Sequence, residues 1–168
     1  MGGLVFMNLE VHFSSKTDLW STPKNLFDIL DSIYHFNTDV CSTNQNHLCD
    51  HFYTKETDGL KQEWKGVCWM NPPYGRTIGE WVKKAYHSSL NGTVVVCLLP
   101  ARTDTKWFQS YCFPYASVIK FIDGRLKFGD SQNSAPFPSC IVVFDKFHKF
   151  NQLGKQNIGR LTFIPSRR

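Results

Sequence analysis

Residues 67–75 read Val67-Cys68-Trp69-Met70-Asn71-Pro72-Pro73-Tyr74-Gly75. An apolar run of this length, followed by turn-forming residues, predicts a buried strand that opens into a loop. Each proline fixes its own φ and lacks an N–H group, so the turn is stiff and its carbonyl groups have no local donor competing for them. The segment therefore predicts a rigid loop at the end of a strand, with the side chain of Asn71 at its start.

A helix and a second strand are predicted directly after this loop. The helix is indicated by apolar residues spaced i, i+3, i+4 and i+7, and Asn91-Gly92 is a typical helix end. The apolar residues are Ile78, Trp81, Val82 and Ala85. Residues 93–99 are continuously apolar after Thr93, which is typical of a strand covered on both faces. A strand, helix and strand in this order form a right-handed crossover, so we expect an α/β fold whose core sheet is mostly parallel.

The flanking regions complete a predicted three-layer architecture. Upstream, a helix is expected with Thr22 as its N-cap and Pro23 at its first helical position, followed by a short strand over residues 36–41. Downstream, strands over residues 118–122 and 125–128 flank Asp123-Gly124, a strong hairpin signal, and residues 141–144 form a last strand. We expect residues 1–19 to be an N-terminal arm and residues 145–168 to be a basic tail that is either solvated or in contact with phosphates.

Size and composition limit the function classes. A chain of 168 residues with 42% hydrophobic content is expected to form a single domain, and its net charge of +5 suits a polyanionic partner. It shows no secretory signal and no run long enough to span a membrane, and its six cysteines form no C-x-x-C pair, so we expect a cytoplasmic protein with buried thiols. Four Cys and His residues between positions 41 and 51 match no common zinc spacing, so we predict no metal site.

The loop at Asn71 resembles the catalytic loop of S-adenosylmethionine-dependent methyltransferases that act on amino or amide nitrogen. The lone pair of an amine such as adenine N6 is delocalised into its ring, so a planar amine attacks poorly. The Asn71 side-chain oxygen can accept one amine hydrogen and the main-chain carbonyl of Pro72 the other, which favours a tetrahedral nitrogen with its lone pair aimed at a methyl group. Tyr74 offers an aromatic face on which a flipped base can stack. The alternative is an ordinary turn after a strand.

The sequence from about Val11 to Phe144 is similar to the small phage-type, Dam-like DNA N-6-adenine methyltransferases. The matching segments are Trp20-Ser21-Thr22-Pro23, Asp39-Val40-Cys41, Asp58-Gly59-Leu60, Trp69 to Gly75, Leu98 to Asp104, Gly124 to Gly129 and Asn133 to Pro138. This resemblance implies a Rossmann-like methyltransferase sheet, S-adenosyl-L-methionine as the methyl donor, and adenine N6 in DNA as the acceptor. Protection of phage DNA from host restriction would be a role consistent with it.

The resemblance also implies site residues. The catalytic residues would be Asn71, Pro72, Pro73 and Tyr74, and the cofactor-binding residues would be Trp20, Thr22, Pro23, Asp39, Cys41, Asp58 and Asn71. Asp39 ends a predicted strand, where a carboxylate is well placed to bind a ribose hydroxyl or a sulfonium cation, although an acidic residue at such a position also commonly caps a turn.

Two departures from the family pattern affect these expectations. Most amino-methyltransferases have a glycine-rich loop after the first strand, whereas this chain has Asp39-Val40-Cys41-Ser42-Thr43-Asn44. No segment is long enough for a separate target-recognition domain, so a short or relaxed target sequence is expected. The candidates for DNA contact are Arg76, Arg102, Arg125 and Lys127.

Two other functions remain open at this point. One keeps the chemistry and changes the acceptor to adenine in RNA or glutamine in a protein. The other is a catalytically inactive nucleic-acid-binding module that has the fold and has lost the cofactor. Neither the target sequence nor the oligomeric state, monomer or dimer, follows from the residues.

Overall fold

The computed structural model of the chain describes residues 20–149 and the backbone of residues 161–165. In this part of the chain, seven strands form one sheet in the order β2-β1-β3-β4-β6-β5-β7. The strands are β1 (Thr38–Asp39), β2 (His51–Phe52), β3 (Val67–Met70), β4 (Val94–Pro100), β5 (Val118–Ile122), β6 (Ser139–Phe144) and β7 (Leu161–Pro165). β2, β1, β3 and β4 are parallel neighbours, whereas the pairs β4–β6, β6–β5 and β5–β7 are antiparallel.

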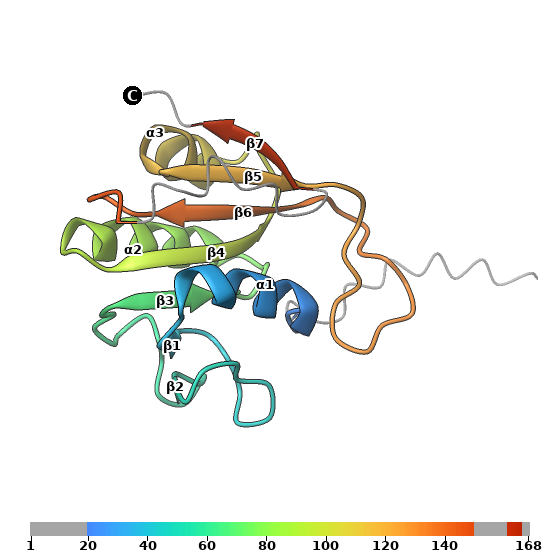
Figure 1. Cartoon of the computed structure of the whole chain (residues 1–168), viewed down its shortest axis with the longest axis horizontal. Coiled ribbons are helices and arrows are strands. Elements are labelled where there is room, and N and C mark those ends of the chain that lie inside the picture. The colour runs from blue at the N-terminus through green and yellow to red at the C-terminus, as the bar shows by residue number, and fades with distance from the viewer. Residues whose placement is uncertain (1–19, 150–160, 166–168) are drawn as a thin grey trace, which may run out of the picture.

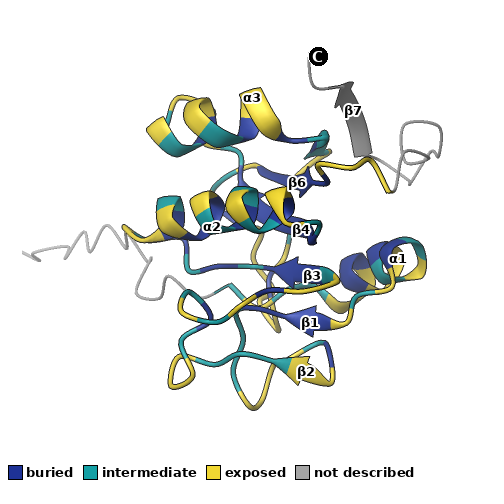
Figure 2. Cartoon of the chain, turned by 90° about the vertical axis from the view of Figure 1, so that its left-hand side faces the viewer, coloured by how far each residue is buried: buried dark blue, intermediate teal, exposed yellow. Residues whose placement is uncertain are grey.

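Helices lie on both faces of this sheet. They are α1 (Lys24–Tyr34), α2 (Ile78–Leu90), the π-helix η1 (Phe108–Cys112) and the short α3 (Phe113–Tyr115). α1 covers one face, and α2 and α3 lie on the other, as the two perpendicular views show (Figure 1 and Figure 2). The predicted α/β class and the layered arrangement are confirmed, and the parallel part of the sheet is limited to the half that carries β1 to β4.

The core lies where the helices meet the central strands. All seven residues of β4 and all six of β6 are buried, and α2 buries the apolar face that its spacing predicts (Figure 2). On the other face, the ring of Phe27 in α1 contacts that of Trp69 in β3 edge-on at 5.5 Å. Five of the six cysteines are buried and all six are free thiols. No helix in the described residues is long and apolar enough to cross a membrane.

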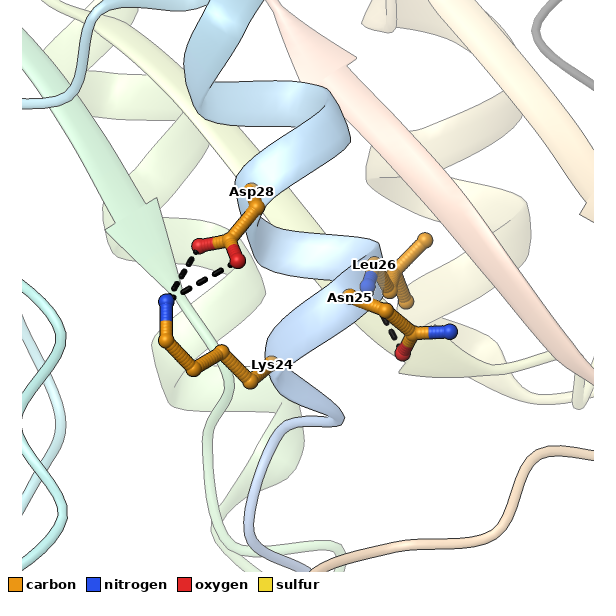
Figure 3. A network of polar contacts seen from close by, with 4 residues as sticks. All are labelled: Lys24, Asn25, Leu26 and Asp28. Carbon is orange, nitrogen blue, oxygen red and sulfur yellow. Dashed lines mark hydrogen bonds and ion pairs between the residues drawn. The ribbon is translucent and has the colours of Figure 1, made fainter.

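The start of α1 differs from the expectation by one residue. The helix begins at Lys24, and the carbonyl of Pro23 accepts hydrogen bonds from the main-chain N–H groups of Leu26 and Phe27. Figure 3 shows two further contacts in this turn: an ion pair between Lys24 and Asp28 at 2.7 Å, and the Asn25 side chain accepting from the Leu26 N–H. The side chain of Thr22 does not cap the helix, which leaves its hydroxyl free for the contact described below.

The predicted hairpin at Asp123-Gly124 is wrong. Residues 125–128 form no strand, and β5 instead pairs with β6 across a loop of residues 123–138. The other edge of β5 pairs with β7, which lies inside the predicted basic tail, so neither edge remains for a third strand. The loop of residues 123–138 extends beyond the end of the sheet toward which β3 points (Figure 1). The predicted arm, residues 1–19, lies outside the described residues.

Candidate active site

The candidate site lies at the carboxyl ends of β1 and β3. These strands are parallel neighbours, and the sheet continues from β1 to β2 on one side and from β3 to β4 on the other. The strand order therefore reverses between β1 and β3. In open α/β sheets, ligands bind in the crevice at the carboxyl ends of the two strands where the order reverses. Asp39 ends β1 and Asn71 directly follows β3. The topology therefore brings together the carboxylate and the amide that the sequence placed at separate strand ends.

The amide of Asn71 is held in one orientation. Its Nδ2 donates to the main-chain carbonyl of Trp20 and, at 2.9 Å, to the Thr22 Oγ1. Because a carbonyl oxygen can only accept, the NH₂ group must face Trp20, and this fixes which end of the amide is the oxygen. The Oδ1 atom is buried and has no hydrogen-bond partner among the described residues. The site therefore presents a fixed, unsatisfied acceptor.

The rest of the loop is rigid and closely packed. Pro72 is buried and Pro73 is half-buried, and no donor among the described residues bonds the Pro72 carbonyl. Tyr74 is anchored twice: its hydroxyl donates to the Leu98 carbonyl at 3.2 Å, and its own carbonyl accepts from the Arg102 Nη1 at 3.1 Å. The loop thus keeps an acceptor at Pro72 that no group in residues 20–149 uses.

The ring of Tyr74 is enclosed rather than open. It is only 3% exposed, and the rings of Phe137 and Phe128 approach it edge-on at 5.5 and 6.1 Å. Both phenylalanines belong to the loop of residues 123–138, and both also contact the Trp20 ring, at 5.0 and 5.3 Å. The Gly129 N–H donates to the Ser21 carbonyl at 2.8 Å and ties the loop to the same segment. A base can therefore reach the face of Tyr74 only if this loop moves.

Asp39 is a buried carboxylate at the wall of a small cavity. It is 2% exposed, and its oxygens accept from the main-chain N–H groups of Cys41 and Leu48 at 3.3 and 3.1 Å. Burial raises the pKa of Asp39 to about 7, although these hydrogen bonds and the charge of His47 lower it. The cavity measures about 50 Å³, and its lining includes Trp20, Ser21, Thr22, Asp39, Cys41, Ser42, Thr43, Asn46, Leu48, Trp69, Asn71 and Pro72.

A larger cavity of about 780 Å³ adjoins the first, and Cys41, Ser42 and Thr43 line both. Asp58 lies on its wall, so five predicted cofactor residues line the small cavity, Asp58 lines the large one, and Pro23 lines neither. Gly59, also on this wall, allows a close approach, since a Cβ atom there would lie 2.1 Å from the Val40 carbonyl oxygen.

The loop of residues 39–44, which stands where most amino-methyltransferases have a glycine-rich loop, has few free main-chain N–H groups. Its main-chain N–H groups bond inside the protein: Cys41 to Asp39, Ser42 to the Tyr53 carbonyl, and Thr43 to the Asn46 side chain. Burial raises the pKa of the Cys41 thiol to about 12, so this thiol is neutral. A ligand here would meet side chains more than main-chain N–H groups.

The predicted DNA-contacting residues are all exposed and follow strands that end near the site. Arg76 lies after β3, Arg102 after β4, and Arg125 and Lys127 in the loop of residues 123–138. Arg102 differs from the other three in its bond to the Tyr74 carbonyl, so it supports the loop whether or not it contacts DNA. No cluster of three or more His, Cys, Asp or Glu side chains within the described residues could hold a metal ion.

Several lining residues were not predicted as site residues. Ser42, Thr43, Asn46 and Leu48 belong to a polar loop whose sequence has no distinguishing signal. Trp69 could have been predicted to line the site, because it lies two residues before Asn71 and residues two apart in a strand share a face.

Comparison of the sequence with known proteins shows similarity to DNA methyltransferases. The sequence model of the DNA N-6-adenine-methyltransferase (Dam) family matches residues 11–166. The chain is 29% identical over 139 residues to the DNA N-6-adenine-methyltransferase of Haemophilus phage HP1, covering 78% of this chain and 80% of that protein. It is 39% identical over 106 residues to the DNA N-6-adenine-methyltransferase of Escherichia phage T1, covering 61% of this chain and 44% of that longer protein.

Proposed function

Because the chain belongs to the DNA N-6-adenine-methyltransferase (Dam) family, we propose that it transfers a methyl group from S-adenosyl-L-methionine to adenine N6 in DNA, with Asn71 and the Pro72 carbonyl binding the target amine. The observation that carries this proposal is the buried Oδ1 of Asn71, which has no partner among the described residues while the other end of the amide is held. A fixed amide with an unused acceptor is suited to bind an incoming N–H group.

The cavities fit the proposed cofactor. Ligand pockets usually measure about 300 to 1000 Å³, and the large cavity, of about 780 Å³, falls in this range and adjoins the small cavity that Asn71 and Asp39 line. Trp20, Thr22, Asp39 and Cys41 would hold the cofactor at the small cavity, and Asp58 at the large one. When bound there, the cofactor supplies an electrophilic methyl group.

The chain's own residues act on the acceptor nitrogen. The Asn71 Oδ1 and the Pro72 carbonyl accept the two amine hydrogens, which draws the nitrogen out of conjugation and aims its lone pair away from the loop. Because both acceptors belong to a stiff, buried segment, little reorganisation is needed during the reaction. No protein nucleophile takes part. Thr22 and the Trp20 carbonyl position Asn71, and Arg102 and the Leu98 carbonyl position Tyr74.

Entry of the base requires a change at the loop of residues 123–138. We expect Phe128 and Phe137 to move when a flipped adenine stacks on Tyr74, because both rings now lie against it. Arg125 and Lys127 lie on the same loop and are exposed. Their contact with DNA phosphates would therefore be coupled to the movement that uncovers Tyr74.

The test is methyl transfer to DNA. The full chain is incubated with unmethylated duplex DNA of varied sequence and labelled S-adenosylmethionine, and N6-methyladenine is measured by mass spectrometry. Asn71→Ala should lose turnover by about 100-fold or more and still bind S-adenosylhomocysteine. Asn91→Ala, which follows α2 away from the cavities, should keep full activity. Cofactor binding without N6-methyladenine, or methylation of RNA or of a glutamine peptide instead, would overturn the proposal.

A further inference from the structure

Trp69 has a polar group that makes no hydrogen bond within the described part of the chain. Its side chain is 0% exposed, and the indole Nε1–H has no hydrogen-bond partner among the described residues. Trp64 provides the contrast within the same protein, because its equally buried indole donates to the Gly59 carbonyl at 2.8 Å. Buried donors in native proteins are nearly always paired, and an unpaired one is costly, so the Trp69 N–H calls for an acceptor that the described residues do not supply.

The sheet register places the Trp69 side chain on the same face as a carboxylate. Asp39 and Trp69 are directly paired across the parallel strands β1 and β3, so their side chains project from the same face. Asn71 lies two residues beyond Trp69, at the end of the same strand. All three residues line the small cavity of about 50 Å³. The lining of the cavity thus includes the residue with the unpaired donor and the Asp39 carboxylate, while the Asn71 Oδ1 is the acceptor proposed for the target amine.

This combination fits the amino-acid end of S-adenosylmethionine better than its nucleoside end. An amino acid carries a carboxylate, which needs donors, next to an ammonium group, which needs acceptors. A cavity of about 50 Å³ has room for such a small group, whereas the adjoining cavity of about 780 Å³ has room for a nucleoside. We propose that Trp69 is a cofactor-binding residue whose indole N–H donates to the carboxylate of the amino-acid end, while Asp39 faces the ammonium group. This inference rests on the proposed function.

The first test compares two ligands that differ only in the carboxylate. S-adenosylhomocysteine and its decarboxylated analogue, S-adenosyl-3-thiopropylamine, are titrated calorimetrically into wild-type protein and into Trp69→Phe. Loss of one hydrogen bond to a charged group should weaken S-adenosylhomocysteine binding about tenfold in Trp69→Phe. Binding of the analogue should change by less than about twofold, because it has no carboxylate to lose.

A matched variant separates the hydrogen bond from the loss of ring volume. Phe27→Leu reduces the packing against the same indole ring and keeps its N–H. It should bind both ligands as the wild type does. If Phe27→Leu and Trp69→Phe weaken S-adenosylhomocysteine equally, or if Trp69→Phe weakens both ligands equally, the carboxylate contact is refuted.

The second test observes the N–H group directly and does not need a variant that folds. In a ¹H–¹⁵N spectrum of the wild-type protein, the Trp69 indole signal is identified through its ring contacts with Phe27 and Phe36. It should move downfield on saturation with S-adenosylhomocysteine and stay in place with the decarboxylated analogue. If the ligand binds and the signal does not move, the Trp69 N–H donates to a water or to another partner. That result would refute the role of Trp69 and leave the proposed function standing. Absence of any binding would instead refute the proposed cofactor.

Discussion

Cofactor binding should depend on pH through Asp39. Burial raises the pKa of this carboxyl to about 7 in the ligand-free protein. With that pKa, the ionised fraction is about 0.1 at pH 6 and about 0.9 at pH 8. If the ligand binds only the ionised carboxylate, the apparent dissociation constant equals the intrinsic one divided by this fraction. Affinity for S-adenosylhomocysteine should therefore increase about tenfold between pH 6 and pH 8.

The assay is calorimetric titration at pH 6, 7 and 8 in buffers that differ in ionisation enthalpy. At pH 7 about half a proton should be released for each ligand bound, because about half of the carboxyl groups are then protonated. Asp39→Asn should bind more weakly and lose the pH dependence. His47→Gln is the control, because the charge of His47 acts on Asp39 and lowers its pKa, and this variant should keep the pH dependence. A flat wild-type profile, or a slope that persists in Asp39→Asn, would refute the reasoning.

The same carboxyl group affects the stability of the ligand-free protein with a definite sign. The native state holds the proton up to about pH 7, whereas the unfolded chain releases it near its ordinary pKa of about 4. The free energy of unfolding should therefore fall as the pH rises from about 4 to about 7 and then level off. Between pH 5 and pH 8 the Asp39 contribution should fall by on the order of 2 to 3 kcal/mol, measured as the change in the difference in urea unfolding between wild type and Asp39→Asn.

Four further substitutions test the supports of the site and its proposed contacts with DNA. Thr22→Val removes one of the two acceptors that hold the Asn71 amide; if Asn71 acts as proposed, turnover should fall about fivefold to tenfold at unchanged DNA affinity, and a change in affinity alone would contradict this role. Gly59→Ala should destabilise the protein by on the order of 3 kcal/mol in urea unfolding, because its Cβ would meet the Val40 carbonyl at 2.1 Å, and wild-type stability would show that the backbone adjusts easily. Arg125→Gln and Lys127→Gln should each reduce the slope of log affinity for DNA against log salt by about 1 in filter-binding assays, and an unchanged slope would exclude phosphate contact.

Elements that depend on residues close in the sequence were predicted, whereas strand pairing between distant segments was not. The strand before Asn71, helix α2 and strand β4 were predicted correctly, because apolar periodicity and helix-ending residues act within a few positions. The hairpin failed although Asp123-Gly124 is a strong local signal. β6 is buried along its whole length and pairs with β5, and β7 occupies the other edge, so residues 125–128 had no strand to join.

The sequence by itself determined the chemistry that Asn71 and the two prolines can perform, because amide lone pairs and proline geometry are properties of the residues themselves. Only the tertiary structure decided how that chemistry is held. Thr22, expected as a helix cap, accepts from the Asn71 amide, and Tyr74, expected as an open stacking face, is enclosed by Phe128 and Phe137. Trp69, which would pass for an ordinary core residue, lines the small cavity and has an N–H group with no partner among the described residues. These contacts join segments about 50 residues or more apart, or depend on what the folded chain leaves unpaired, and no local pattern encodes either.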